Sequence, residues 1–117
     1  MFKSSYRSNE PYIPKGFAEI WDYLAVLMLA SPRFDNNLWF DANRNIDTVF
    51  FAFNEGLKTI RSDVGEEAYQ KLAALSDRMR AHFEADPDET NGETAKGCML
   101  VYEMQDILKA SRKRRRR

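Results

Sequence analysis

The chain has 117 residues, of which 44% are hydrophobic and 13% aromatic, so it can form one folded domain with a substantial core rather than a disordered polymer. No apolar run approaches the roughly 20 residues that a membrane span requires, and the first sixteen residues lack the continuous apolar stretch of a secretory signal. The single cysteine, Cys98, excludes an internal disulfide and fits a reducing compartment, so we expect a cytoplasmic protein.

The formal net charge of zero is the sum of two oppositely charged parts. Seven basic residues and no acidic ones lie between Lys109 and Arg117. The part of the chain before Lys109 has eleven basic and eighteen acidic residues, a formal charge of −7. We therefore expect an acidic folded body followed by a disordered basic tail at residues 111–117.

The first predicted elements are an extended strap and a helix. Pro11 and Pro14 restrict the backbone of residues 1–16 to extended conformations. A three-and-four spacing of apolar residues then predicts a helix from Phe17 to Ala30, which Pro32 ends. This helix opens a predicted helical domain that spans residues 17–110.

The second predicted helix has the longest apolar repeat. Capping side chains at residues 35–37 precede it, and apolar residues recur every three or four positions from Trp39 until the helix ends near Arg61. Gly56 is unfavourable inside a helix and suggests close approach of a neighbouring helix. Trp39 and Phe40 are adjacent, so their side chains cannot both face inward on one helix, and the same holds for Phe50 and Phe51. One side chain of each pair must therefore be covered by the strap, another helix or a partner.

Two further helices follow. Asp63 and Glu66 have the spacing of a capping box before a third helix, which ends at the polar stretch EADPDETNGE. Thr90 and Glu93 form a second possible capping box before a fourth helix. No useful β-alternation is present, so we predict an all-α protein: a four-helix antiparallel bundle or an irregular helical pack.

Residues that would support catalysis or metal binding are scarce. Zinc and di-iron sites need several His, Cys or paired Glu-x-x-His ligands, whereas this chain has one histidine and one cysteine. We interpret His82 as a boundary residue near Glu84 and Asp86, and Cys98 as a small core residue. No phosphate-binding glycine loop and no nucleophile motif is present. We expect no metal, no cofactor and no enzymatic activity.

The basic tail allows several interpretations, one of which, a nuclear address, requires a eukaryotic host. The tail can also be a solvated disordered end, a nucleic-acid grip that works through phosphate contacts, or a segment that folds back on an acidic surface. Nucleic-acid binding would use the cationic residues Arg112, Lys113, Arg114, Arg115, Arg116 and Arg117. The acidic body would oppose close approach to a polyanion.

The acidic body favours a protein partner instead, because a negative surface speeds encounter with a basic protein and adds specificity. The predicted contact surface combines the acidic loop with exposed aromatic residues: Glu84, Asp86, Asp88, Glu89, Trp39 and Phe40. We expect charge reversal at Asp86 and Glu89 to weaken partner binding without unfolding the bundle.

One family resemblance fits this expectation. The segment LAALSDRMRAHFEADPDE follows the apolar helix ANRNIDTVFFAF and precedes another helix. Residues 38–108 resemble small all-helical immunity proteins against NAD-degrading toxins of type VI secretion systems. The resemblance consists of this order of helices and of Phe83 and Glu84 followed by an acidic loop. The resemblance implies a non-enzymatic inhibitor that covers a toxin's active site.

The sequence therefore predicts a protein-binding protein of the immunity or antitoxin kind. The alternative is a nucleic-acid-associated accessory protein that uses the arginine cluster. A third possibility is an enzyme or ligand-binding bundle, which an enclosed polar pocket would favour.

Overall fold

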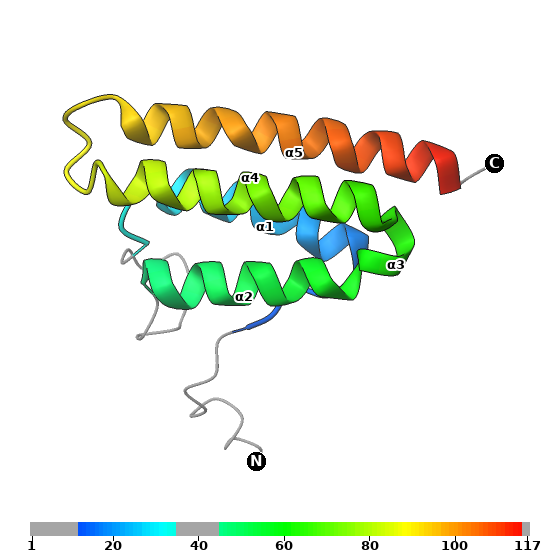
Figure 1. Ribbon diagram of the computed structural model, residues 1–117. Coiled ribbons are helices and arrows are strands. Elements are labelled where there is room, and N and C mark those ends of the chain that lie inside the picture. Colours follow the sequence, from blue (N-terminus) through cyan, green and yellow to red (C-terminus); the bar gives the residue numbers. More distant parts are fainter. Residues whose placement is uncertain (1–11, 35–44, 116–117) are drawn as a thin grey trace, which may run out of the picture.

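The structure, a computed structural model, describes residues 12–34 and 45–115 (Figure 1). These residues form helices and no strands, so the all-α prediction is confirmed for the described part. The helices are α1 (Gly16–Ala30), α2 (Ile46–Thr59), α3 (Arg61–Val64), α4 (Glu66–Glu84) and α5 (Glu93–Arg115).

The four long helices are packed in the order α1, α2, α4, α5, with α5 closing against α1. Each runs in the opposite direction to the helices beside it (Figure 1). The short α3 lies at one end and contacts α2, α4 and α5. This arrangement puts the first and last helices side by side, so residues far apart in the sequence share one surface.

Aromatic rings fill the core at the end where α1 and α4 finish. Phe34, Phe50 and Phe83 are fully buried, and their ring centroids lie 5.5–6.2 Å apart. In α2, Phe50 is buried whereas the side chain of Phe51 is 51% exposed. The prediction that these two neighbours cannot both face inward is therefore confirmed.

Two glycines allow close helix contacts. A Cβ atom on Gly56 would lie 2.7 Å from the Pro14 carbonyl oxygen and 2.8 Å from Ile20 Cδ1. A Cβ atom on Gly97 would lie 2.6 Å from the Phe83 ring. The predicted close approach at Gly56 is confirmed, and the neighbours are α1 and the segment before it.

The predicted start of the second helix is wrong. Asn45 is extended, with φ −156° and ψ −179°, and its Oδ1 accepts the Thr48 N–H at 3.0 Å, so α2 begins after Asn45. The Thr48 hydroxyl accepts the Asn45 N–H at 2.9 Å, which completes the cap. The predicted first turns, with Trp39 and Phe40, lie outside the described residues.

The helices that follow also differ from prediction at their ends. Gly65, with φ +93°, immediately precedes α4, so Asp63 is not the cap of that helix and lies in α3 instead. Helix α5 continues to Arg115, and Ser111 is buried against the bundle. Residues 111–115 are therefore helical rather than a disordered tail, and residues 116–117 lie outside the description.

Part of the predicted strap is described. Residues 12–15 have no regular structure, Ile13 packs against the core, and Pro14 is buried. Gly16 already belongs to α1, and residues 1–11 lie outside the description.

Candidate functional site

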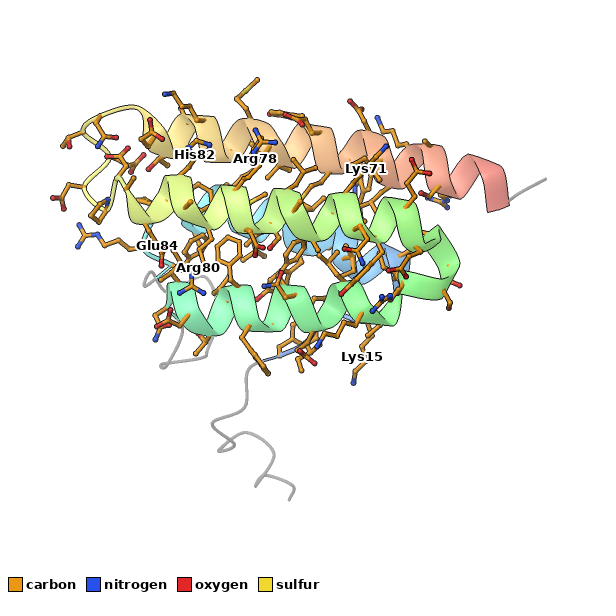
Figure 2. The ribbon with its side chains drawn as sticks, viewed as in Figure 1. Lys15, Lys71, Arg78, Arg80, His82 and Glu84 are labelled. Carbon is orange, nitrogen blue, oxygen red and sulfur yellow. The ribbon has the colours of Figure 1, made fainter. Side chains whose placement is uncertain are left out.

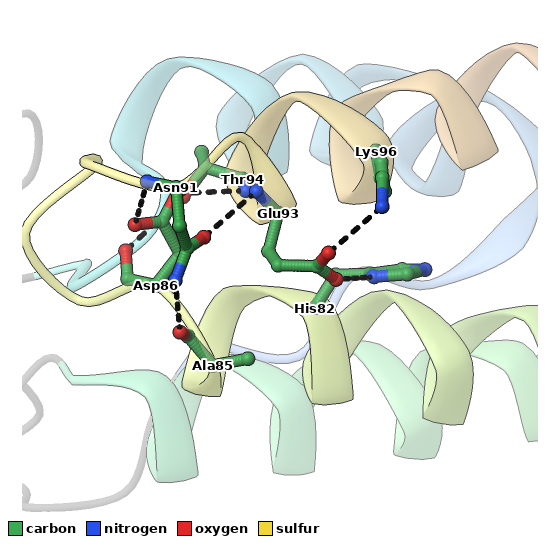
Figure 3. A network of polar contacts seen from close by, with 7 residues as sticks. All are labelled: His82, Ala85, Asp86, Asn91, Glu93, Thr94 and Lys96. Atoms are coloured by element: carbon green, nitrogen blue, oxygen red, sulfur yellow. Dashed lines mark hydrogen bonds and ion pairs between the residues drawn. The ribbon is translucent and has the colours of Figure 1, made fainter.

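The connection between α4 and α5 is organised around Asp86, which is only 2% exposed (Figure 3). Its carboxylate accepts the backbone N–H groups of Thr90, Asn91 and Thr94 at 2.7, 3.2 and 3.1 Å. The Thr94 hydroxyl donates to the Asp86 carbonyl oxygen at 3.2 Å. Asp86 therefore holds the first turn of α5 in place, as a cap does.

This finding corrects two sequence predictions. Asp86 is not an exposed contact residue, and its charge reversal would disrupt the connection itself. The first turn of α5 is not held by the predicted Thr90–Glu93 box but by Asp86 and by Asn91, whose Oδ1 accepts the Glu93 N–H at 3.0 Å.

The other predicted acidic residues of the loop are exposed. Glu84 accepts Arg80 Nε at 3.0 Å, and Arg80 also pairs with Asp47 of α2 (Figure 2). Asp88 lies 4.0 Å from Arg33, and both side chains are largely exposed. Glu89 is exposed, with a backbone φ of +55°. Asp88 and Glu89 are thus exposed at this end of the bundle, and Asp88 lies beside the segment that follows α1.

His82 does not pair with Glu84 or Asp86. Its Nδ1 lies 2.7 Å from Glu93 Oε1, which joins α4 to α5, and Lys96 Nζ donates to the other oxygen of Glu93 at 2.9 Å (Figure 3). The Lys96 ammonium, followed by His82, holds the pKa of Glu93 below its usual value. The expected boundary position of His82 is observed, but its partner is different.

The basic end of α5 lies on the aromatic residues of α1. The Lys109 ammonium is 5.9 Å from the centroid of the Trp21 ring, and the Arg112 guanidinium is 5.4 Å from that of Phe17. These two rings are stacked, with centroids 6.3 Å apart. With Ala18 and Asp22, these residues line a groove of about 280 Å³. Of the other predicted tail residues, Lys113, Arg114 and Arg115 extend α5, while Arg116 and Arg117 lie outside the described part.

An exposed apolar surface was not predicted from the sequence. Leu29 of α1 is 70% exposed, and Met99 and Tyr102 of α5 are 61% and 49% exposed. Ser31 Oγ and Cys98 Sγ lie 3.5 Å apart, so the two helices meet within one turn of Leu29 and Met99. We call Leu29, Met99 and Tyr102 the α1/α5 apolar patch. Cys98 itself is only partly buried beneath it.

The described residues contain neither a membrane-spanning helix nor a cluster of metal ligands. No helix there is long and apolar enough to cross a membrane. Nor do three or more His, Cys, Asp or Glu side chains gather there as candidate metal ligands.

Comparison with known proteins gives no match. No family model, curated protein or solved structure matches the chain.

Proposed function

We propose that this chain is a non-enzymatic, protein-binding protein of the immunity or antitoxin kind, and that its α1/α5 apolar patch contacts the partner. The observation that supports this proposal is the high exposure of Leu29, Met99 and Tyr102, at 70%, 61% and 49%, on neighbouring helices. Burial of apolar surface contributes about 25 cal/mol per Å², so a partner that covers these side chains gains binding energy from all three.

The composition of α1 supports the same conclusion. Helix α1 has only two charged residues, Glu19 and Asp22, a pattern typical of a helix buried on most sides. Nevertheless, one line of its residues faces solvent: Ala18, Asp22, Ala25 and Leu29. Their spacing of three and four residues places them on one face, which we call the α1 outer face. The small side chains on this face allow another surface to approach closely.

Acidic residues border the patch. The contact between Arg33 and Asp88 places the acidic loop at the end of the bundle where α1 finishes. Asp88 and its neighbour Glu89 therefore lie beyond this end of the patch and give its apolar centre a negative rim on that side, as in many protein interfaces. A negative rim favours a partner with a basic surface.

The test is a growth assay with the product of the reading frame next to this gene, expressed as the candidate toxin. We expect this chain to restore growth, and Leu29→Asp or Tyr102→Asp to abolish the rescue. Phe51→Asp is the matched control, because Phe51 on α2 is an apolar residue that is about as exposed as Tyr102. All variants are compared by circular dichroism and melting temperature. Equal rescue by the two patch variants and the control would disprove the proposed contact face, and a harmless neighbouring product would disprove the toxin assignment.

A second candidate function is nucleic-acid binding, which the groove beside Lys109 and Arg112 favours. Phosphate contacts by these cations would make binding strongly dependent on salt. Double substitution Lys109→Ala and Arg112→Ala would weaken binding to a single-stranded oligonucleotide and reduce the slope of log K against log salt by about 1.4. Absence of salt-dependent binding would exclude this candidate.

A further inference from the structure

The neighbouring helices α1 and α5 carry two unlike surfaces along their line of contact. At one end lies the α1/α5 apolar patch, in which Leu29 is 70% exposed. At the other end lies the groove of about 280 Å³, whose α1 wall includes Phe17 and Trp21 and whose α5 wall includes Lys109 and Arg112. A protruding apolar side chain and an apolar recess therefore lie on the same pair of helices.

The α1 outer face joins the patch to the groove. Ala18 and Asp22 of this face line the groove, whereas Leu29 of this face belongs to the patch. The α1 residues of the groove are centred nine to ten residues before Leu29, a distance of roughly 14 Å along the helix. A two-fold axis at the midpoint passes near Ala25 and places Leu29 of each copy over the groove of the other. In a two-fold interface both such contacts form at once, so this face is complementary to itself.

The side chains between the two contact points allow two copies of α1 to approach closely. Ala18 and Ala25 are small and exposed, so the backbones of two facing helices can come near each other. Asp22 is the only charged residue of the α1 outer face, and it lines the same groove as Lys109 and Arg112. These two cations offset its charge, so the face as a whole does not repel a second copy.

The charges at the two ends of the bundle determine how a second copy is oriented. Asp88 and its neighbour Glu89 lie at the end where α1 finishes. At the start of α1, Arg112 lies over the Phe17 ring, and α5 continues from there to Arg115 (Figure 1). Antiparallel copies place the acidic loop of each beside the basic end of the other, whereas parallel copies bring like charges together.

We propose that a second copy of this chain occupies the α1 outer face and forms an antiparallel two-fold dimer, with Leu29 of each copy in the groove of the other. This inference goes beyond the proposed function and does not rest on it. The contact uses one helix face and its borders, which is small for a protein interface, so we expect a dissociation constant on the order of 10–100 μM. At lower concentration the chain is a monomer. A partner protein that contacts the α1/α5 apolar patch competes with the second copy.

The first experiment is analytical ultracentrifugation of the full chain over concentrations that span the expected dissociation constant. We expect the mass to rise from that of one chain to that of two and no further. Leu29→Asp should weaken the dimer by at least about tenfold, because it brings a charge into an apolar contact. Phe51→Asp on α2 is the matched control and should dimerise as the wild type does. A monomer at every concentration, assembly beyond two copies, or equal effects of the two substitutions would overturn the proposal.

Disulfide crosslinking tests the position of the two-fold axis. The background is Cys98→Ser, which removes the only cysteine. Ala25→Cys lies near the axis and should crosslink to itself, since a disulfide requires Cα atoms roughly 4.4–6.8 Å apart. Ala18→Cys is the matched control on the same face, because its two copies lie roughly 19 Å apart along the helices and should not crosslink. A mixture of Ala18→Cys and Leu29→Cys chains should give the mixed disulfide.

The crosslinking outcomes distinguish the two orientations of the copies. Crosslinking of Ala18→Cys to itself as efficiently as Ala25→Cys would indicate parallel helices and overturn the proposal. Absence of the mixed disulfide between Ala18→Cys and Leu29→Cys would overturn it as well.

The dimer and the proposed function fail separately. A chain that stays monomeric and still restores growth would leave the proposed function intact and exclude the dimer. A dimer with the expected crosslinks but without growth rescue would retain the two-fold contact and exclude the toxin assignment.

Discussion

The Asp86 carboxylate accepts the N–H of Thr94 at 3.1 Å, across eight residues of sequence, and so connects the end of α4 to the first turn of α5. The first backbone N–H groups of any helix have no partner within the helix. Here a residue of the preceding loop provides the missing acceptor. This carboxylate consequently stabilises the fold, while the neighbouring exposed carboxylates remain available to a partner.

Substitution Asp86→Asn is expected to destabilise the protein. The amide retains one acceptor oxygen but directs an NH₂ group toward backbone donors, so at least one buried hydrogen bond is lost. We expect the melting temperature, measured by circular dichroism, to fall by on the order of 5–10 °C. Asp88→Asn is the matched control, since Asp88 is exposed, and should leave the melting temperature nearly unchanged. Equal effects of both substitutions would contradict the role assigned to Asp86.

The Asp86 carboxylate should also make the stability of the fold depend on pH in the acidic range. Burial raises the pKa of Asp86, but its hydrogen bonds with Thr94, Thr90 and Asn91 outweigh this effect, so its pKa lies below the usual 3.8. A lowered folded-state pKa gives stability that is present above pH 3.8 and is lost as the pH falls through the folded-state value. In urea unfolding, the difference between the wild type and Asp86→Asn should therefore shrink below about pH 4. A constant difference down to pH 2 would exclude this linkage.

The Tyr12 hydroxyl should lose its proton only at unusually high pH. Its hydrogen bond to Glu19, followed by burial and the nearby carboxylates, raises its pKa from 10.0 to about 12. A raised folded-state pKa means that the corresponding stability is present below pH 10 and is lost as the pH rises toward 12. Absorbance at alkaline pH, measured against a Tyr12→Phe variant, should show this late ionisation, and Glu19→Gln should lower the pKa of Tyr12. An unshifted pKa of Tyr12 would contradict its hydrogen bond to Glu19.

Gly56→Ala should destabilise the protein, although alanine is the better helix former by about 1 kcal/mol. The added Cβ would meet the Pro14 carbonyl oxygen at 2.7 Å, and a backbone atom cannot move as cheaply as a side-chain end. Overpacking costs about 1–3 kcal/mol, so we expect a net loss of about 1 kcal/mol. The measurement is the urea midpoint, with the exposed substitution Lys58→Ala in the same helix as control. A stabilised Gly56→Ala variant would show that α1 can move away from α2.

Two phenylalanines provide a matched comparison of core and surface. Phe83 is fully buried against Phe34 and Phe50, so Phe83→Ala should lower the free energy of unfolding by about 3–5 kcal/mol. Phe51 is half exposed, and Phe51→Ala should cost less than about 1 kcal/mol. Chemical denaturation of both variants tests the predicted packing. Similar losses would mean that the orientation of α2 is wrong.

Apolar spacing predicted much of the helical architecture, since it is a direct consequence of burying one face. It predicted α4 closely and the opposite orientations of Phe50 and Phe51. The start of α2 was missed because the spacing Trp39, Ala42, Ile46 continues the repeat across Asn45. Spacing records which residues could share a face, whereas a cap depends on two local hydrogen bonds, here those between Asn45 and Thr48.

The candidate sites were harder to predict, because they depend on contacts between distant parts of the chain. Asp86 is one of several acidic residues in a polar loop, and only the return of α5 brings Thr94 to it. Likewise, α1 is hydrophobic enough to suggest burial on most sides, yet the bundle leaves Leu29 exposed. The hydrogen bond between Tyr12 and Glu19 likewise joins the segment before α1 to the helix across seven residues.

The antiparallel course of α4 and α5 places the acidic loop at one end of the bundle and the arginine-rich end of α5 at the other (Figure 1). A molecule with zero formal net charge is thereby a large electric dipole along its length. It should consequently adsorb to both anion- and cation-exchange matrices at low ionic strength, presenting opposite ends to each.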